Sequence, residues 1–462
     1  MLHIKSPLMY LPEREYIFKV IFQEFLGVAY TVNFEMCTEI ELTVLGCEDK
    51  KLRLADTFLQ TDVEQWLQTE SLPRSPLAVL EHPILGNLPI IFGKRNGSGS
   101  YYENHPQVSY CGIDICGSAF YMLTRYEECV GTERDQKDRF LSHHSLAFRE
   151  GFLNRPIINE YVELLWEMLI TLWPGLTRAM RTSKFILSHD VDWPFYTVGK
   201  THLQMLKEAV ADTVKRYSVD SAYKKAKAMW FTRSGNLSRD PFNTFRWIMD
   251  QSEKAGIRSA FYFITQETAK GLDGNYSMYD PEIQQLVREI YARGHEIGLH
   301  PSFYTYNDTN RIKEQFSILI DVMQANGIYQ QAWGGRQHYL RWKGPATWQF
   351  WEDAGLNYDS TLSYSDMPGF RCGVCYEYSV FNLETRQQLK LKERPLIVME
   401  QTILHAAYMG LKRQEALELI TYYYEQCKRF NGDFTLLWHN SQLVKSGEVA
   451  LYEDCMQLVQ TY

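Results

Sequence analysis

Two aspartates close one short apolar run of this chain. The segment "FILSHDVDWPFY" (185–196) places Asp190 and Asp192 two residues apart, so both carboxylates share one face if the segment is a regular strand. Carboxylates this close repel one another unless a cation or hydrogen bonds offset the repulsion. The pattern therefore indicates either a general base beside a metal ligand, or a polar strand end that caps the turn near Pro194. His189 would point the other way, as a structural or supporting group.

Four more ionisable residues follow apolar runs later in the chain. They are His300 in "GHEIGLHPSFY", Arg336 in "WGGRQHYLRW", Asp359 in "NYDSTLSY" and His439 in "FTLLWHNS". A histidine at a strand end can bind a metal, and an arginine can pair with a base or clamp an anion. An aspartate can orient an imidazole, and a histidine titrates near neutrality and can act as a general acid. Taken singly, each could equally be a structural ion pair or a core histidine.

Helical and strand patterns alternate from residue 184 onward. After a first strand at 185–188, five stretches each read as a helix followed by a strand: 241–264, 280–300, 311–336, 346–360 and 413–440. A charged stretch at 201–240 reads as a further helix. This alternation predicts parallel strands in a barrel or an open α/β sheet. Catalytic groups gather at the C-terminal ends of such strands, so we expect the residues at these ends to meet in one pocket.

Residues 1–180 predict a separate α+β domain ahead of a domain at 181–462. Strands are expected at 39–46 and 87–93, and helices at 114–130 and 155–174, with Asp114 as the N-cap of the first helix. No group of residues in this half has the spacing of a catalytic site.

Composition excludes some classes of binding partner and indicates where the protein is located. The chain has 462 residues and a net charge of -8, which argues against nucleic acid or an anionic membrane as the main partner. No apolar run reaches the roughly 18 to 20 residues of a membrane span, and the first residues do not resemble a secretory leader, so we expect a cytoplasmic protein. Nine scattered cysteines favour reduced thiols, and Cys372 and Cys375 are expected in a loop rather than in a zinc site.

These residues, in this order, resemble the polysaccharide deacetylase family, the NodB-homology domain, over about residues 184–445. "GHEIGLHPSFY" is similar to the second family motif up to His300, and "SHDVDWP" loosely resembles the first. "GGRQHY", Asp359-Ser360 and "LLWHN" resemble the third, fourth and fifth. The resemblance implies an α/β fold, an irregular (β/α) barrel with seven parallel strands. "SAFYMLTRYEE" makes the first half similar to an uncharacterised domain found ahead of such barrels.

The resemblance also implies a reaction and a role for each residue. The reaction is the metal-dependent hydrolysis of a C–N bond that is not a peptide bond, with zinc as the usual metal. The metal ligands would be Asp192 and His300. The residues implied in catalysis are Asp190 as base, Arg336 orienting that base, His439 as acid and Asp359 orienting His439. The implied substrate is an N-acetylated sugar or a sugar-containing precursor in surface polysaccharide synthesis.

Two departures from the family pattern keep alternatives open. Val191 separates two aspartates that are adjacent in the family, so either Asp190 or Asp192 could be the ligand. The second metal histidine is expected four residues after His300, where this chain has Tyr304. Either another group completes the site, or the metal differs, or the protein is a non-catalytic carbohydrate-binding protein. Hydrolysis of a different amide on the same fold is a further alternative.

Overall fold

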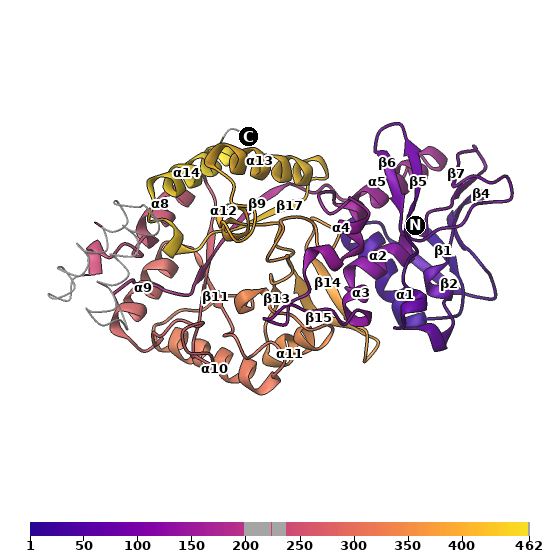
Figure 1. Cartoon of the computed structure of the whole chain (residues 1–462). Coiled ribbons are helices and arrows are strands. Elements are labelled where there is room, and N and C mark those ends of the chain that lie inside the picture. Colours follow the sequence, from indigo (N-terminus) through magenta and orange to yellow (C-terminus); the bar gives the residue numbers. More distant parts are fainter. Residues whose placement is uncertain (198–222, 224–236, 461–462) are drawn as a thin grey trace.

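A nine-stranded sheet organises the second half of the chain in the computed structural model, which describes residues 1–197, 223 and 237–460 (Figure 1). Its strands, in sheet order, are β14 (Tyr378–Asn382), β15 (Gln387–Glu393), β13 (Tyr358–Asp359), β12 (Gly334–Gly335), β11 (Glu296–Leu299), β10 (Ser259–Phe263), β9 (Lys184–Val191), β17 (Asp433–Leu437) and β16 (Val398–Met399). All neighbours pair in parallel except β14, which is antiparallel to β15. The charged stretch expected to be helical at 201–240 lies outside the described residues up to 236, Tyr223 apart.

The two outer parallel strands of this sheet are consecutive in the chain, and this closes the barrel. β15 pairs with β13, and β16 pairs with β17, while only residues 394–397 separate β15 from β16. Within this link Arg394 N donates to the Asp359 carbonyl at 2.7 Å, and Ile397 N donates to the Thr435 carbonyl at 3.3 Å. Pro395, which has no N–H, separates the two pairings. Counting β15 and β16 as one interrupted strand gives seven parallel positions, so the expected irregular barrel is confirmed.

Helices surround these strands (Figure 1). They are α8 (Phe245–Lys254), α9 (Pro281–Ala292), α10 (Thr309–Ala325), α11 (Ala346–Ala354), α12 (Glu400–Leu404), α13 (Arg413–Arg429) and α14 (Ser446–Gln460). α9 buries Ile283, Leu286, Val287 and Ile290, which recur at helical spacing. Its stop at Gly294 has φ 79°, a left-handed conformation that glycine adopts without strain. Among the described residues, no helix combines the length and the apolar character needed to cross a bilayer.

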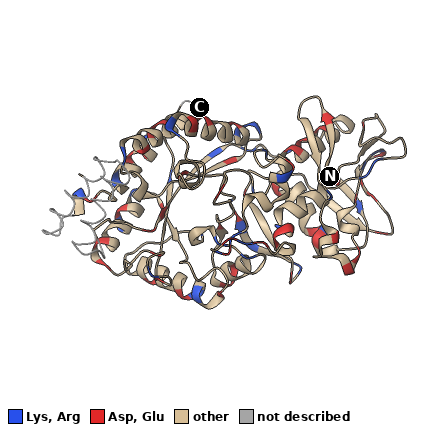
Figure 2. Cartoon of the chain, viewed as in Figure 1, with Lys and Arg blue, Asp and Glu red and all other residues tan. Residues whose placement is uncertain are grey.

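The first half is an α+β unit, as expected. A mixed sheet has the order β2 (Tyr30–Phe34), β1 (Leu2–Ser6), β3 (Ile40–Val44), β4 (Cys47–Leu54), β8 (Val108–Cys111) and β7 (Tyr102–Glu103), and β5 (Ala78–His82) and β6 (Gly86–Ile90) form a hairpin. The helices are α1 (Leu11–Phe18), α2 (Ile115–Leu123), α3 (Tyr126–Val130), α4 (Leu146–Arg149) and α5 (Ile157–Leu172). Acidic and basic residues are interspersed along the described parts of both halves of the chain (Figure 2).

The helix expected at 114–130 is broken in two. Asp114 caps α2 by accepting from Gly117 N at 2.7 Å, as predicted. The chain then turns at Arg125, whose φ of 53° is left-handed. The guanidinium of Arg125 is buried and donates to Glu128 at 2.9 Å and to Glu127 at 3.0 Å. Because these contacts fix the turn, α3 starts as a separate helix.

The two halves share one continuous apolar core. Tyr16 packs on Phe381 with ring centroids 4.9 Å apart, and Phe25 packs on Tyr376 at 5.1 Å. The proposed boundary near residue 180 therefore separates two units that pack closely, and it stays a prediction.

Candidate active site

Hydrogen bonds of the parallel sheet bring the predicted residues to one edge. The ladder continues one step past the strands: His300 N donates to the Phe263 carbonyl at 2.8 Å, and Arg336 N donates to the Leu299 carbonyl at 3.1 Å. In the same way Trp438 N, next to His439, bonds the Ser188 carbonyl at 3.0 Å. The residue after each strand is therefore held at the same level of the barrel.

Two glycines let the strands approach closely at this edge. A side chain at Gly335 would place a Cβ atom 1.7 Å from the Leu299 carbonyl oxygen. At Gly334 a Cβ atom would lie 2.2 Å from the ring of Tyr358. Any larger residue would force β12 away from β11 and β13, and Arg336 would move with it.

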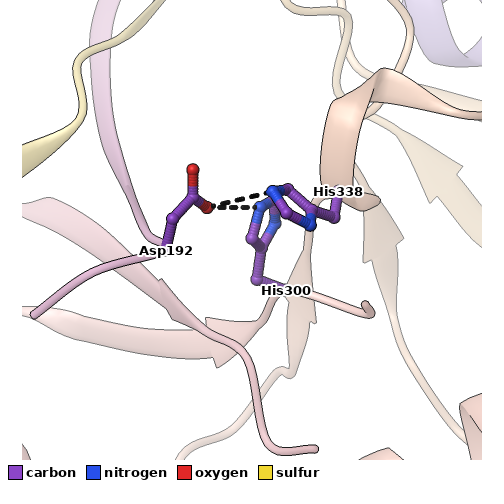
Figure 3. A group of neighbouring side chains, drawn as sticks. All are labelled: Asp192, His300 and His338. Atoms are coloured by element: carbon purple, nitrogen blue, oxygen red, sulfur yellow. Dashed lines mark ion pairs between the residues drawn. The ribbon is translucent and has the colours of Figure 1, made fainter. Parts of the chain in front are cut away.

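Three donors converge in front of the strand ends (Figure 3). They come from Asp192, His300 and His338, and one ligand atom of each lies within 4.8 Å of the other two. Asp192 Oδ1 is 3.1 Å from His300 Nε2 and 3.5 Å from His338 Nε2. One carboxylate oxygen and two imidazole nitrogens form a donor set that divalent zinc and related metals accept.

The neighbours of both histidines orient them for a metal. His300 Nδ1 lies 2.5 Å from the Arg336 carbonyl, and His338 Nδ1 lies 2.8 Å from Asp273 Oδ1. Because these acceptors hold the proton on Nδ1, the lone pair of each Nε2 faces the shared point. His300 Nε2 and Asp192 Oδ1 are buried and have no hydrogen-bond partner. The residues present therefore fit a divalent cation, which would satisfy both atoms.

His338 is the ligand candidate that the sequence analysis missed. The family pattern places a third ligand four residues after His300, but Tyr304 at that position is 49% exposed and packs against Phe303. His338 instead follows Arg336 by two residues, the same spacing that puts Asp190 and Asp192 on one side of the chain. That two-residue spacing is the feature of the sequence that could have indicated His338 as a ligand.

A strained turn follows this ligand candidate. Tyr339 and Leu340 both have positive φ values, 62° and 55°, a conformation that side chains rarely adopt. This turn follows His338 directly, at the wall of the cavity that the metal donors line.

The two aspartates have different neighbours. Asp190 Oδ1 accepts from Arg336 Nη1 at 2.8 Å, while Asp190 Oδ2 lies 3.8 Å from His300 Nε2. Arg336 is itself fixed, since it donates to the Ser360 carbonyl at 2.8 Å and to Ser188 Oγ at 3.0 Å. Asp190 thus lies beside the metal donors with an arginine behind it, and Asp192 lies among them.

His439 is oriented by Glu400, which corrects the expected role of Asp359. His439 Nδ1 lies 2.6 Å from Glu400 Oε1, and its Nε2 lies 3.7 Å from Asp192 Oδ2. Burial lowers the pKa of His439, but Glu400 and the two aspartates outweigh burial and raise it to about 10. Asp359 instead accepts from Thr361 N at 2.9 Å, so its hydrogen bonds hold the loop after β13. Burial raises the pKa of Asp359 to about 7, and its hydrogen bonds with Thr361 oppose this shift.

Comparison with protein families accounts for both halves of the chain. A family model described as polysaccharide deacetylase matches residues 241–348, and a family of unknown function, DUF7033, matches residues 2–174. The chain carries a polysaccharide deacetylase domain behind a DUF7033 domain. No curated protein matches the chain.

Solved structures resemble the chain only distantly. A Mycobacterium smegmatis protein assigned to the polysaccharide deacetylases is 17% identical, with a TM-score of 0.38 over 60% of this chain and 84% of its own. An allantoinase is 11% identical, with a TM-score of 0.35 over 61% and 84%. The chitin deacetylase of Colletotrichum lindemuthianum is 12% identical, with a TM-score of 0.28 over 61% and 86%.

Two polar motifs of the deacetylase domain lie away from the metal donors. His189 points to the outer side of the strand, where its Nδ1 contacts the Trp438 carbonyl at 2.6 Å and its ring stacks on Phe261. Burial lowers its pKa to about 3, so it is a neutral core residue. Cys372 and Cys375 are buried in the loop between β13 and β14, as expected of two loop thiols.

A cavity of about 230 Å³ opens onto the metal donors. Asp190, Asp192, His300, His338 and His439 all line it. Its remaining wall includes residues that were not among the predicted site residues, namely Arg139, Trp193, Tyr339, Gln401, Tyr408 and Gln442. Arg139 belongs to the DUF7033 domain, in which the sequence showed no site. The deacetylase cavity is therefore built from both domains.

Proposed function

We propose that this protein is a metal-dependent amide hydrolase that removes the acetyl group from an N-acetylated sugar. The observation that carries the proposal is the set of donor atoms on Asp192, His300 and His338, which lie beside a carboxylate and an imidazole in one cavity. Two of these donor atoms are buried and have no hydrogen-bond partner. Family membership supports the acetylated sugar, and the expected place in surface polysaccharide synthesis stays a prediction.

Asp192, His300 and His338 would hold the cation. A divalent metal at this position supplies Lewis acidity toward an acyl carbonyl and lowers the pKa of a nearby water. Asp190 is the proposed general base, because its Oδ2 faces the metal donors while Arg336 holds its Oδ1. The arginine orients this carboxylate through a charge-assisted hydrogen bond.

His439 is the proposed general acid. Glu400 accepts the proton of Nδ1, so the second proton of the imidazolium lies on Nε2, which faces the cavity. Water adds its oxygen to the carbonyl carbon and gives a proton to Asp190, and His439 protonates the nitrogen as the C–N bond breaks. The products are acetate and a free amine. The raised pKa of His439 keeps the proton available at neutral pH.

The structure weakens the main rival. A non-catalytic carbohydrate-binding protein was suggested by Tyr304, which left the metal with only two ligands. His338 supplies a third ligand atom, the second nitrogen, from a different loop, so that argument no longer applies. Hydrolysis of another amide at the same residues would follow the same chemistry and differs only in the group that fills the cavity.

Two measurements on the intact chain test the proposal. Zinc titration of the metal-stripped protein by calorimetry should show one site with affinity in the micromolar range or tighter. The zinc-loaded protein should release acetate from N-acetylglucosamine or from penta-N-acetylchitopentaose, and the stripped protein should not. A protein that binds no divalent metal, or that binds zinc and releases acetate from neither sugar, contradicts the proposal.

A further inference from the structure

One loop of the DUF7033 domain reaches the mouth of the deacetylase cavity. This loop, residues 131–145, is called the Arg139 loop below, because Arg139 lines the cavity together with the metal donors. Arg139 is buried and stands at the cavity wall, across the boundary between the two domains. The chemistry described above makes no use of this residue.

Hydrogen bonds dock the Arg139 loop on the barrel. The Tyr306 hydroxyl bonds the Asp138 carboxylate, and Arg341 Nε donates to the Lys137 carbonyl at 2.8 Å. Ser142 Oγ donates to Asp366 Oδ2 at 2.6 Å. The barrel partners lie in the loops after β11, β12 and β13, which also carry His300 and His338. The loop is therefore fixed to the segments that position the metal donors.

Asp135 holds the side chain of Arg139 in place. Its Oδ2 accepts from Arg139 Nε at 2.9 Å and from Nη2 at 2.7 Å, and its Oδ1 accepts from the backbone N of Arg139 at 2.9 Å. A guanidinium held at two nitrogens loses little rotamer freedom when it binds a ligand. Its charge is already compensated, so it offers directed hydrogen bonds rather than net positive charge.

Two other charged groups of the cavity, Asp190 and His439, are also paired with a group of opposite charge. Asp190 pairs with Arg336, and Glu400 pairs with His439. The wall adds the aromatic rings of Trp193 and Tyr339. Aromatic faces, amides and a hydroxyl at this wall suit a neutral ring with many hydroxyl groups.

We propose that the Arg139 loop is the part of the DUF7033 domain that recognises the substrate of the deacetylase domain. Arg139 donates a hydrogen bond to a hydroxyl or ring oxygen of the neutral sugar that carries the acetylated nitrogen. The DUF7033 domain thus completes the active site, and Arg139 is a specificity-determining residue. This inference rests on the proposed function.

The test replaces the guanidinium and separates binding from chemistry. Arg139→Met in the full zinc-loaded chain should raise KM for the sugar that the wild type deacetylates, N-acetylglucosamine or penta-N-acetylchitopentaose, by about 10- to 100-fold, the usual loss for a hydrogen bond to a charged group. We expect kcat to change less than about 3-fold and zinc affinity to stay unchanged, because Arg139 contacts neither the base nor the metal donors. Arg149→Met, at an exposed position of α4, is the matched control and should leave KM unchanged.

A second variant tests the docking without touching the cavity. Tyr306→Phe removes the hydroxyl that bonds Asp138, and it should raise KM in the same direction by less than Arg139→Met. The inference would be overturned if Arg139→Met and Arg149→Met had equal KM values, or if Arg139→Met raised KM only for N-acetylglucosamine 6-phosphate. Either result would leave the proposed function standing. A wild type that releases no acetate overturns both.

Discussion

Two buried clusters of charged side chains lie in this molecule, and they are built in opposite ways. At the domain contact, Arg371 donates to both carboxylate oxygens of Glu128, one of them at 2.9 Å, and Arg125 bonds the same residue at 2.9 Å. All charged groups of this interface cluster have partners of opposite charge. In the metal cluster of Asp192, His300 and His338, a carboxylate oxygen and two imidazole nitrogens face one another. Two buried atoms of this cluster have no hydrogen-bond partner.

The difference separates a structural cluster from a functional one. Removing a charge from water costs several kcal/mol, and the interface cluster offsets that cost with its own ion pairs. The metal cluster leaves two of its buried atoms without a hydrogen-bond partner, and a bound cation would satisfy both. Substitutions in the two clusters should accordingly produce separate losses, of chemistry in one and of stability in the other.

The largest effect is expected for Asp190→Asn, beside the metal cluster. Loss of a general base should lower kcat for acetate release by about 10²- to 10⁴-fold. The amide keeps an oxygen for Arg336, so the melting temperature should fall far less than the rate. Asp250→Asn, at an exposed carboxylate of α8, is the control and should retain full activity. An active variant, or one that does not fold, contradicts a catalytic role for Asp190.

Arg371→Met addresses the interface cluster. This change leaves Glu128 buried without its main partner, which typically costs about 3–5 kcal/mol of unfolding free energy. Urea unfolding measures the loss, and zinc affinity of the folded protein should not change. Arg413→Met breaks an exposed ion pair with Asp454 and should cost at most about 1 kcal/mol. Similar losses in the two variants would show that the buried network does not stabilise the domain contact.

His338→Ala tests whether the metal cluster depends on the ligand that the sequence did not reveal. Loss of a contact that only orients a metal ligand weakens metal affinity by about 10- to 100-fold. Loss of the ligand itself should therefore weaken zinc affinity by about 100-fold or more. Calorimetric zinc titration measures the change. His405→Ala, at an exposed histidine after α12, should bind zinc as the wild type does. Unchanged zinc affinity in His338→Ala would remove this residue from the site.

The smallest effect is a pH dependence that belongs to the interface cluster. Burial raises the pKa of Glu128, but Arg371 and Arg125 outweigh burial and lower it from an ordinary value of 4.5 to about 2. Its contribution to stability is therefore present above pH 4.5 and is lost as the pH falls toward 2. One such carboxylate adds at most about 1.4 kcal/mol of unfolding free energy per pH unit.

Urea unfolding at pH 5 and at pH 3 measures this slope. Glu128→Gln cannot titrate, so its stability should fall less between the two pH values than that of the wild type. Equal slopes in the two proteins would mean that Glu128 does not carry the acid sensitivity of the domain contact.

Local patterns in the sequence determined much of the fold. Helices α8 and α9 and strands β10 and β11 lie where periodicity placed them, with Gly256 and Gly294 in left-handed stops. The N-cap Asp114 was also predictable, because a cap depends only on residues within one helical turn. The strand ends at Asp190, His300, Arg336 and His439 could be predicted because each follows its own apolar run.

Tertiary structure decided the partners of those residues. Glu400 lies 39 residues from His439 in sequence, Arg139 comes from another domain, and His338 lies 38 residues after the ligand it joins. Parallel strands meet through long crossovers, so the spacing along the chain does not record which strand ends become neighbours. Sequence alone therefore determined the polar strand ends and the helices between them. Only the closed barrel, with the DUF7033 domain packed on it, decided which groups face the cation, which orient the acid, and which wall the substrate would meet.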